Sequence, residues 1–204
     1  MTAPTFVVLE GLDGVGKSTV ARLLAERLGA ELLTTPAPAL RATFTALRQS
    51  LATAPAALTL TYAAMVCAAS TQVRRLRAAG RSVVVDRYFL STWVYGQVLR
   101  SAEFPAAALV ALAAELEVAD ATVYLRAPLD LRRSRILSRC HSSEEDPLTC
   151  FAETAASLDA AYQQAARAPV TGRWLPVEVG HLDQHQVVNR VLEELAHSQV
   201  EGLI

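Results

Sequence analysis

The chain lacks a surplus of charge of either sign. Its 204 residues include 19 Lys and Arg against 20 Asp and Glu, a formal net charge of −1 at pH 7. Nucleic-acid-binding domains are usually basic, so we expect no nucleic-acid partner. No run of 18 or more uncharged apolar residues is present, so we expect no membrane-spanning helix. The N-terminus has no charged segment ahead of an apolar one, and no secretory signal peptide is expected.

Cysteine and histidine are too scarce and scattered to suggest a disulfide framework or a metal centre. The three cysteines, Cys67, Cys140 and Cys150, are odd in number and widely spaced. The late histidines have no neighbouring residues that could complete a metal site, so we expect them on the surface. Reduced thiols, and with them a cytoplasmic location, are the simplest expectation.

What the chain does contain is apolar material for a sizeable core. Hydrophobic residues make up 52% of the sequence. At this length we expect one domain, residues 1–204, with a small mobile lid at about 132–150.

The most informative stretch is residues 11–18, GLDGVGKS, which fits G-x-x-x-x-G-K-[ST] at every fixed position. A short apolar run at 6–9 precedes it, and an amphipathic helix is expected at 20–28. A strand, a glycine loop and a helix N-terminus in this order predict a phosphate-binding loop. The plain alternative is a glycine-rich turn before an ordinary helix, but the loop and both flanks together favour phosphate binding.

The residue types of this loop suit a nucleoside triphosphate. Glycines allow the backbone N–H groups to turn inward around phosphate oxygens. Lys17 supplies a cation for the β and γ phosphates, and the Ser18 hydroxyl is a ligand for Mg²⁺. We therefore expect ATP and Mg²⁺ at a set of loop residues: Gly11, Asp13, Gly14, Val15, Gly16, Lys17, Ser18 and Thr19.

A second candidate site follows the strongly β-like run at 82–86. An uninterrupted apolar run predicts a strand buried on both faces of a parallel sheet. Asp86 then lies at the carboxyl end of that strand, where ligands bind in open α/β sheets. Asp86 is a candidate Mg²⁺ ligand and Arg87 a candidate anion clamp. The alternative is that Asp86 caps the following helix.

A helix expected at 128–139 is rich in arginine: Arg132, Arg133, Arg135 and Arg139. Asp130 is the only acid in this segment, so we expect that not all four arginines find a partner nearby. A helix that closes over a triphosphate would use them. The alternative is a basic surface paired with acids elsewhere in the chain.

Strand-like and helical segments alternate along the whole chain. This alternation predicts an α/β fold with a five-stranded parallel sheet and helices on both faces, a three-layer α/β/α arrangement. The expected strands are 6–9, 31–33, 82–86, 121–125 and 174–179, the last an edge strand because it contains a proline. The expected helices are 20–28, 40–51, 55–79, 88–100, 105–118, 128–139, 147–167 and 183–196.

Taken together, these motifs resemble the thymidylate kinase family of P-loop nucleoside monophosphate kinases over nearly the whole chain. Residues 6–19, including Glu10 and Asp13, are similar to the family's opening motif. Residues 86–95, DRYFLSTWVY, resemble its D-R-[YH]-x-x-S-x-x-x-Y segment. Residues 128–139 are similar to its helix beside the lid.

The resemblance implies in-line transfer of the ATP γ-phosphoryl group to a nucleoside monophosphate, and a homodimer. It implies that Asp13 lies near the sugar hydroxyl and phosphate of the acceptor, and that Arg87 binds the acceptor phosphate. Asp86 would organise the metal and its waters, and Arg135 or Arg139 would meet the transferred phosphoryl group. The acceptor-side residues implied by the resemblance are Glu10, Arg41, Tyr62, Arg87 and Tyr95.

The chain departs from the family on the acceptor side. The family's Phe-x-x-Asp-Arg run, whose arginine helps to read the base, appears as Tyr62 to Val66, so that arginine is missing. Its Glu-Pro-Gly stretch appears as Thr35 to Ala37, and the glutamine after the tyrosine of the D-R-Y segment is Gly96. We hypothesise an acceptor that is dTMP or another pyrimidine or modified nucleotide, with Arg41 as a candidate replacement for the missing cation.

Two other functions fit these motifs. A nucleoside kinase would need a carboxylate base for a 5′-hydroxyl, and Glu10 or Asp86 could serve. A non-catalytic ATP-binding protein would explain the losses on the acceptor side. The intact loop and the arginine-rich helix favour a nucleotide kinase over both.

Overall fold

A computed structural model of the chain describes residues 4–138, 148–180 and 182–201. Its centre is a five-stranded sheet in the order β2-β3-β1-β4-β5, and each neighbouring pair of strands is parallel. The strands are β1 (Phe6–Gly11), β2 (Glu31–Thr34), β3 (Val83–Asp86), β4 (Ala121–Arg126) and β5 (Arg173–Glu178). This confirms the expected fold class and the edge position of the last strand.

Eight α-helices connect and flank these strands within the described residues. They are α1 (Lys17–Leu28), α2 (Arg41–Ser50), α3 (Pro55–Ala78), α4 (Phe89–Leu99), α5 (Ala106–Ala113), α6 (Leu129–Leu137), α7 (Ala152–Ala165) and α8 (Gln184–Glu201). All eight occupy expected segments.

One expected helix, 105–118, is too long, because α5 ends at Ala113. The backbone beyond it finds partners outside a helix. The Glu117 N–H donates to Ser70 Oγ (2.8 Å), and the Ala119 N–H donates to the Val170 carbonyl (3.1 Å). These bonds lead the chain away from the helix axis and into β4.

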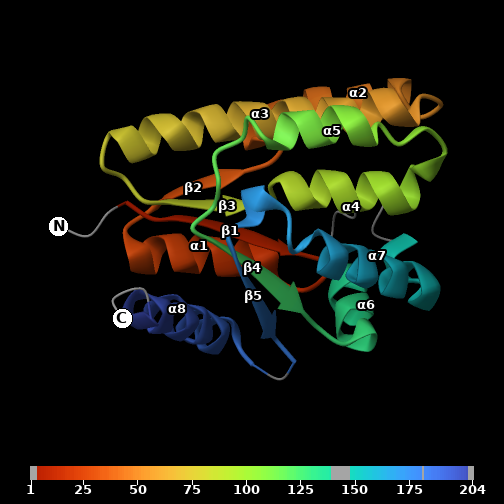
Figure 1. The fold of residues 1–204 in the computed structure, drawn as a ribbon. Coiled ribbons are helices and arrows are strands. Elements are labelled where there is room, and N and C mark those ends of the chain that lie inside the picture. Colours follow the sequence, from red (N-terminus) through yellow and green to blue (C-terminus); the bar gives the residue numbers. More distant parts are fainter. Residues whose placement is uncertain (1–3, 139–147, 181, 202–204) are drawn as a thin grey trace.

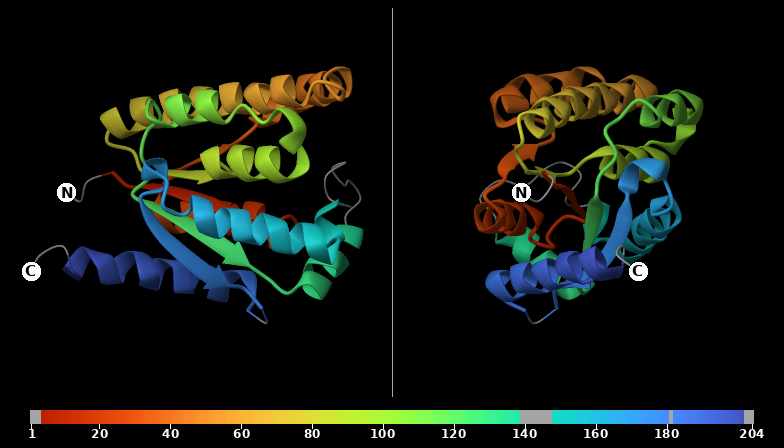
Figure 2. Two further views of the ribbon diagram at one scale, coloured as in Figure 1. Left: turned by 45° about the vertical axis from the view of Figure 1, so that its right-hand side comes forward. Right: turned by 60° about the vertical axis from the view of Figure 1, so that its left-hand side comes forward.

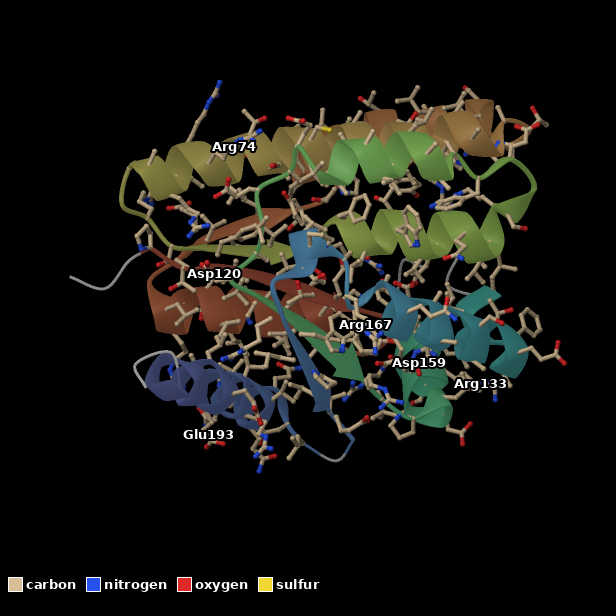
Figure 3. The ribbon with its side chains drawn as sticks, viewed as in Figure 1. Arg74, Asp120, Arg133, Asp159, Arg167 and Glu193 are labelled. Atoms are coloured by element: carbon tan, nitrogen blue, oxygen red, sulfur yellow. The ribbon has the colours of Figure 1, made fainter. Side chains whose placement is uncertain are left out.

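Helices cover both faces of the sheet, as Figure 1 shows. Contacts place α1 and α8 together on one face, and α3, α4 and α7 on the other. Both α2 and α5 lie with α3, on the side of the molecule farthest from α8 (Figures 1 and 2). Asp159 on α7 (Figure 3) accepts hydrogen bonds from Tyr124 Oη (2.7 Å) and Arg126 Nε (3.3 Å), which tie α7 to β4.

The core lies around β1, the central strand. All residues of β1 and β3 are buried, as expected for strands covered on both faces of a parallel sheet. In register, Leu9 pairs with Asp86 of β3 and with Val123 of β4. The end of β1, and with it the glycine loop, therefore lies directly beside Asp86.

Helix α3 is apolar and 24 residues long, enough by length and composition alone to cross a membrane. Core helices meet the same test, and α3 packs against α4 and against β2 and β3. Its buried side chains include Leu58, Val66 and Val73, and the last two belong to the hydrophobic core.

Candidate active site

The glycine loop joins the end of β1 to the start of α1. Helix α1 begins at Lys17, and its N-cap residue, Gly16, has a left-handed backbone (φ 98°) with no side-chain cap. The first N–H groups of a helix need partners, and an uncapped N-terminus suits an anion. Ser18 is exposed and Thr19 half-buried in the first turn. The structure therefore places the expected ATP-binding residues around one helix N-terminus.

Two arginines of α6 hold the carbonyl groups of the loop from outside. Arg132 Nε donates to the Asp13 carbonyl (2.8 Å), and Arg135 Nη1 donates to the Val15 carbonyl (3.2 Å). The C=O and N–H of one peptide plane point in opposite directions. Because α6 holds these carbonyls, the N–H groups of the same planes, those of Gly14 and Gly16, point away from α6. A phosphate cradle uses backbone N–H groups arranged in this way.

Gly14 has a further reason to be glycine. Its φ is 85°, and a Cβ atom added there would lie 2.7 Å from the Arg132 carbonyl oxygen. The backbone of α6 therefore packs directly against the back of the loop. The motif predicted the glycine, but only the structure shows this close approach.

Asp13, Arg87 and Tyr95 meet at the side of the loop. Asp13 is 7% exposed, forms an ion pair with the Arg87 guanidinium and accepts a hydrogen bond from Tyr95 Oη (2.7 Å). Burial raises the pKa of Asp13, but Arg87 and Lys17 outweigh it and lower that pKa to about 2. Asp13 is therefore a carboxylate at neutral pH, and it fixes the position of the Arg87 side chain.

Arg87 itself has a strained backbone. Its φ of 69° is unusual for a residue with a side chain. The Arg87 N–H donates to the Leu9 carbonyl (3.0 Å), so the end of β1 holds the turn in place. Strained residues of this kind persist where the surrounding structure determines them, often at functional sites.

Glu10 has a different place from the one expected. It is fully buried, and it accepts hydrogen bonds from the Tyr88 N–H (2.9 Å), Ser91 Oγ (2.5 Å) and Tyr162 Oη (3.3 Å). Burial raises the pKa of Glu10, and its hydrogen bonds to Ser91 and Tyr88 counter the rise in part. These contacts brace the turn that carries Arg87. They do not fit the expected contact of Glu10 with the acceptor, because no surface of its side chain is open.

Asp86 lies where expected, at the end of β3. It is 4% exposed, and its Oδ1 atom is buried without a hydrogen-bond partner among the described residues. The alternative role as a helix cap is wrong, because α4 begins after Tyr88 and has no side-chain cap. A buried carboxylate oxygen that lacks a partner, beside the loop that carries the Ser18 hydroxyl, fits a divalent cation such as Mg²⁺ or its bound water.

Lys17 lies folded inside the loop. Its Nζ donates to the Leu12 carbonyl (2.8 Å) and lies 3.9 Å from Asp13 Oδ1. Burial and the nearby Arg87 lower the pKa of Lys17 to about 8, although Asp13 and Asp86 oppose that change. A desolvated cation of this kind gains strongly from an anionic ligand.

The arginine-rich helix is better paired than its sequence indicates. Arg132 is 2% exposed and also donates to the Thr149 carbonyl (2.9 Å), and Arg133 (Figure 3) donates to the Cys150 carbonyl (2.8 Å). The expectation that these two close over a triphosphate is wrong, because backbone carbonyls hold both of them and Arg133 also pairs with Asp130 (3.5 Å). Arg135 also contacts the loop, but unlike Arg132 it is only half-buried. Arg139 lies outside the described residues, as does the side chain of Arg41.

Tyr62 lies on α3 in a small group of side chains. Its ring packs on Phe44 of α2 (centroids 4.6 Å apart), and the Arg100 guanidinium lies 5.2 Å above it. Sequence reasoning did not single out Arg100, because the residue ends a helix with no motif around it.

Comparisons with known proteins agree with this geometry. A family model described as "AAA domain" matches residues 6–165. A probable thymidylate kinase from Caldivirga maquilingensis is 30% identical over 199 residues, which cover 93% of this chain and 90% of that protein. A thymidylate kinase from Glaesserella parasuis is 34% identical over 101 residues, 44% of this chain and 49% of that protein.

Two solved structures share the fold. The thymidylate kinase of Candida albicans superposes with a TM-score of 0.73 at 20% identity, over 97% of this chain and 93% of that one. The thymidylate kinase of Ehrlichia chaffeensis gives a TM-score of 0.67 at 18% identity, over 95% of this chain and 100% of that one.

Proposed function

The chain belongs to the thymidylate kinase family, and we propose that it transfers the γ-phosphoryl group of ATP to dTMP or another pyrimidine or modified nucleoside monophosphate. That it is an ATP-dependent nucleotide kinase follows from its relatives and its P-loop fold. The observation that carries the proposal is the contact between the loop and the Asp86-Arg87 turn. The Asp13–Arg87 ion pair joins the two at one edge of the sheet.

On the donor side, the inward N–H groups of the loop and Lys17 would hold the β and γ phosphates. Mg²⁺, when bound, would neutralise charge on these phosphates, with Ser18 and Asp86 as the residues that hold it directly or through water. Arg135 would reach the transferred group only after its Nη1 atom leaves the Val15 carbonyl, which it holds in the free protein.

On the acceptor side, Arg87 would bind the phosphate of the monophosphate, and Asp13 and Tyr95 would lie beside the sugar. A phosphate oxygen of the acceptor attacks the γ-phosphorus, the bond to the β–γ bridging oxygen breaks, and ADP leaves. A phosphate monoester is already an anion at neutral pH, so this step needs no base. Catalysis then consists of positioning and charge stabilisation.

The burial of Glu10 favours this reaction over phosphorylation of a nucleoside. A 5′-hydroxyl must lose a proton, and Glu10 is a poor base because its oxygens already accept hydrogen bonds within the core. Asp86 would then have to serve both as base and as metal ligand.

We further propose a homodimer, a lid at about 132–150 within a single domain, and a cytoplasmic location. Exposed apolar side chains on α3 and α5, Leu60 (43% exposed) and Val110 (60% exposed), support a subunit interface. Cys67 and Cys150 are free thiols, as expected in a reducing compartment. Light scattering would test the dimer: Leu60→Glu with Val110→Glu should give monomers, whereas an unchanged mass would exclude this interface.

A substrate panel tests the proposed reaction. Purified protein with Mg·ATP is offered nucleoside monophosphates and nucleosides in turn, and ADP release is followed. We expect turnover with pyrimidine monophosphates and none with nucleosides. Turnover with nucleosides only, or ATP binding without any transfer, would exclude the proposal. Lys17→Met serves as the inactive control.

A further inference from the structure

We propose that a cavity lined by α4, α5 and the end of α7 binds a small amphipathic carboxylate, a molecule with one anionic head on an apolar body. This site goes beyond the proposed phosphoryl transfer and does not depend on it. The evidence is the composition of the cavity wall, its one charged side chain, and its position across α4 from the glycine loop.

The cavity has the size and the lining of a ligand site. Its volume is about 590 Å³, within the range of about 300–1,000 Å³ that is usual for small-molecule pockets. Most of the lining residues are apolar: Phe89, Trp93, Val110, Pro169 and the four alanines Ala113, Ala114, Ala165 and Ala168. Trp93 is only half-buried and Val110 is 60% exposed, so apolar surface stays open to solvent here. Covering such surface with an apolar ligand is favourable.

Two aromatic rings form the wall on the α4 side. The centroid of the Trp93 ring lies 6.0 Å from that of Phe89 and 5.0 Å from that of Phe104, the second pair edge to face. Phe89 is 3% exposed, and Trp93 packs against the hydrophobic core. The rings therefore hold their positions before any ligand arrives, and a pre-formed wall reduces the entropy that is lost on binding.

One charged residue lines the cavity, Arg167, which follows α7 (Figure 3). It is exposed, and its side chain forms no salt bridge or hydrogen bond among the described residues. Gln97 and Gln164, also exposed in the lining, add amide N–H donors. A guanidinium binds a carboxylate through two parallel hydrogen bonds, so an acid suits this wall better than an amine or an uncharged molecule.

The cavity lies across α4 from the active site. Phe89, Trp93 and Gln97 follow one another at intervals of four residues, so they share one face of the helix. Ser91 and Tyr95 are displaced from them by two residues, about 200° around the helix, and they contact β1 and the glycine loop. A ligand in the cavity therefore does not occupy the nucleotide site, and neither ATP nor dTMP should displace it.

Binding of decanoate tests the site, because this molecule joins one carboxylate to an apolar chain. Calorimetry compares it with decanol, which has the same chain without the charge, and with octanoate, which is two CH₂ groups shorter. We expect one decanoate per chain. Octanoate should bind about 15-fold more weakly, because less of the chain is buried. Decanol should bind at least about fivefold more weakly, because it lacks the ion pair with Arg167.

Four variants assign the binding to this cavity. Arg167→Gln should weaken decanoate by at least about fivefold and leave decanol unchanged. Ala114→Phe, which adds a ring to an exposed lining position, should weaken both ligands by about 10-fold or more. Arg75→Ala, which changes an exposed arginine on α3 outside the cavity, should match wild type. Trp174→Phe leaves Trp93 as the single tryptophan, so its emission should change as decanoate is added.

Thermal melting without ligand shows whether each variant is folded, and if Ala114→Phe is not, the comparison of decanoate with decanol in Arg167→Gln decides. Equal affinity of wild type for decanoate and decanol, or unchanged decanoate binding in folded Arg167→Gln, overturns the proposal. Displacement of decanoate by ATP or dTMP does the same, because the cavity would then belong to the nucleotide site.

A second copy of the chain is the other possible occupant, because Val110 also belongs to the subunit interface proposed above. If wild type does not bind decanoate, and Ala114→Phe changes the mass measured by light scattering, the second copy covers the cavity and the proposal is overturned. Absence of binding with an unchanged mass overturns it as well. None of these results bears on phosphoryl transfer, which the substrate panel tests separately.

Discussion

Lys17 should destabilise the free protein, and replacing it with methionine should make the fold more stable. Its pKa falls from 10.5 to about 8, mainly because burial disfavours the charged amine. Each tenfold loss of proton affinity corresponds to 1.36 kcal/mol, so a charged Lys17 costs about 3 kcal/mol at neutral pH. Methionine of similar shape removes this cost but also the bond to Leu12, worth about 1 kcal/mol. We expect a net gain of about 2 kcal/mol at pH 7.

The pH dependence gives this prediction its sign. Between pH 8 and pH 10.5 the unfolded chain keeps a proton on Lys17 that the folded chain has lost. Stability therefore rises with pH in this window for wild type and not for the variant. The advantage of Lys17→Met should be largest below pH 8 and disappear toward pH 10.5, where the wild-type amine is neutral in both states.

Urea unfolding without nucleotide, followed by tryptophan fluorescence at several pH values from 7 to about 10, measures the difference between the two proteins. The sequence also offers a direct check, because Lys17 is its single lysine. Protein labelled with ¹³C-lysine would show one side-chain signal, whose titration gives the pKa. A midpoint near 10.5, or a difference in stability that does not change with pH, would refute the reasoning.

Three further changes follow from the same site. Gly14→Ala should destabilise the fold by about 2 kcal/mol or more, because the added Cβ would meet the Arg132 carbonyl. As a control, Gly29→Ala should cost only about 1 kcal/mol, because no atom lies within 4 Å of the added Cβ. Equal losses of stability in thermal melting would contradict this. Asp13→Asn should lower stability by about 2 kcal/mol at pH 7. Because the pKa of Asp13 is lowered from 3.8 to about 2, this difference should be present above pH 3.8 and be lost as pH falls through 2 in acid unfolding. Glu10→Gln should retain most of the turnover, because Glu10 braces a turn; a fall of about 100-fold or more would indicate a general base instead.

The parts of the fold that depend on nearby residues could be predicted from the sequence. The loop at 11–18 and the apolar runs of β1 and β3 are patterns of neighbouring residues. They predicted a parallel sheet with the loop beside Asp86, and the structure confirms that arrangement. Asp183 caps α8 as its residue type indicates, accepting from the Gln186 N–H (2.9 Å).

The parts that failed depend on distant partners. Counting acids near Arg132 and Arg133 could not show that carbonyls at positions 13, 149 and 150 accept their hydrogen bonds. An acidic residue before the loop looks available for chemistry, but Glu10 is enclosed by Ser91 and by Tyr162, 152 residues later. Such pairings come from the topology, and a single sequence does not contain them.

The contact between α6 and the glycine loop has a consequence for the order of events in catalysis. Helix, loop and the Thr149 carbonyl are linked through Arg132, so the donor half is assembled before any nucleotide arrives. A pre-shaped pocket loses little entropy on filling. We therefore expect ATP to enter the empty protein readily, and any adjustment to occur on the acceptor side of the site.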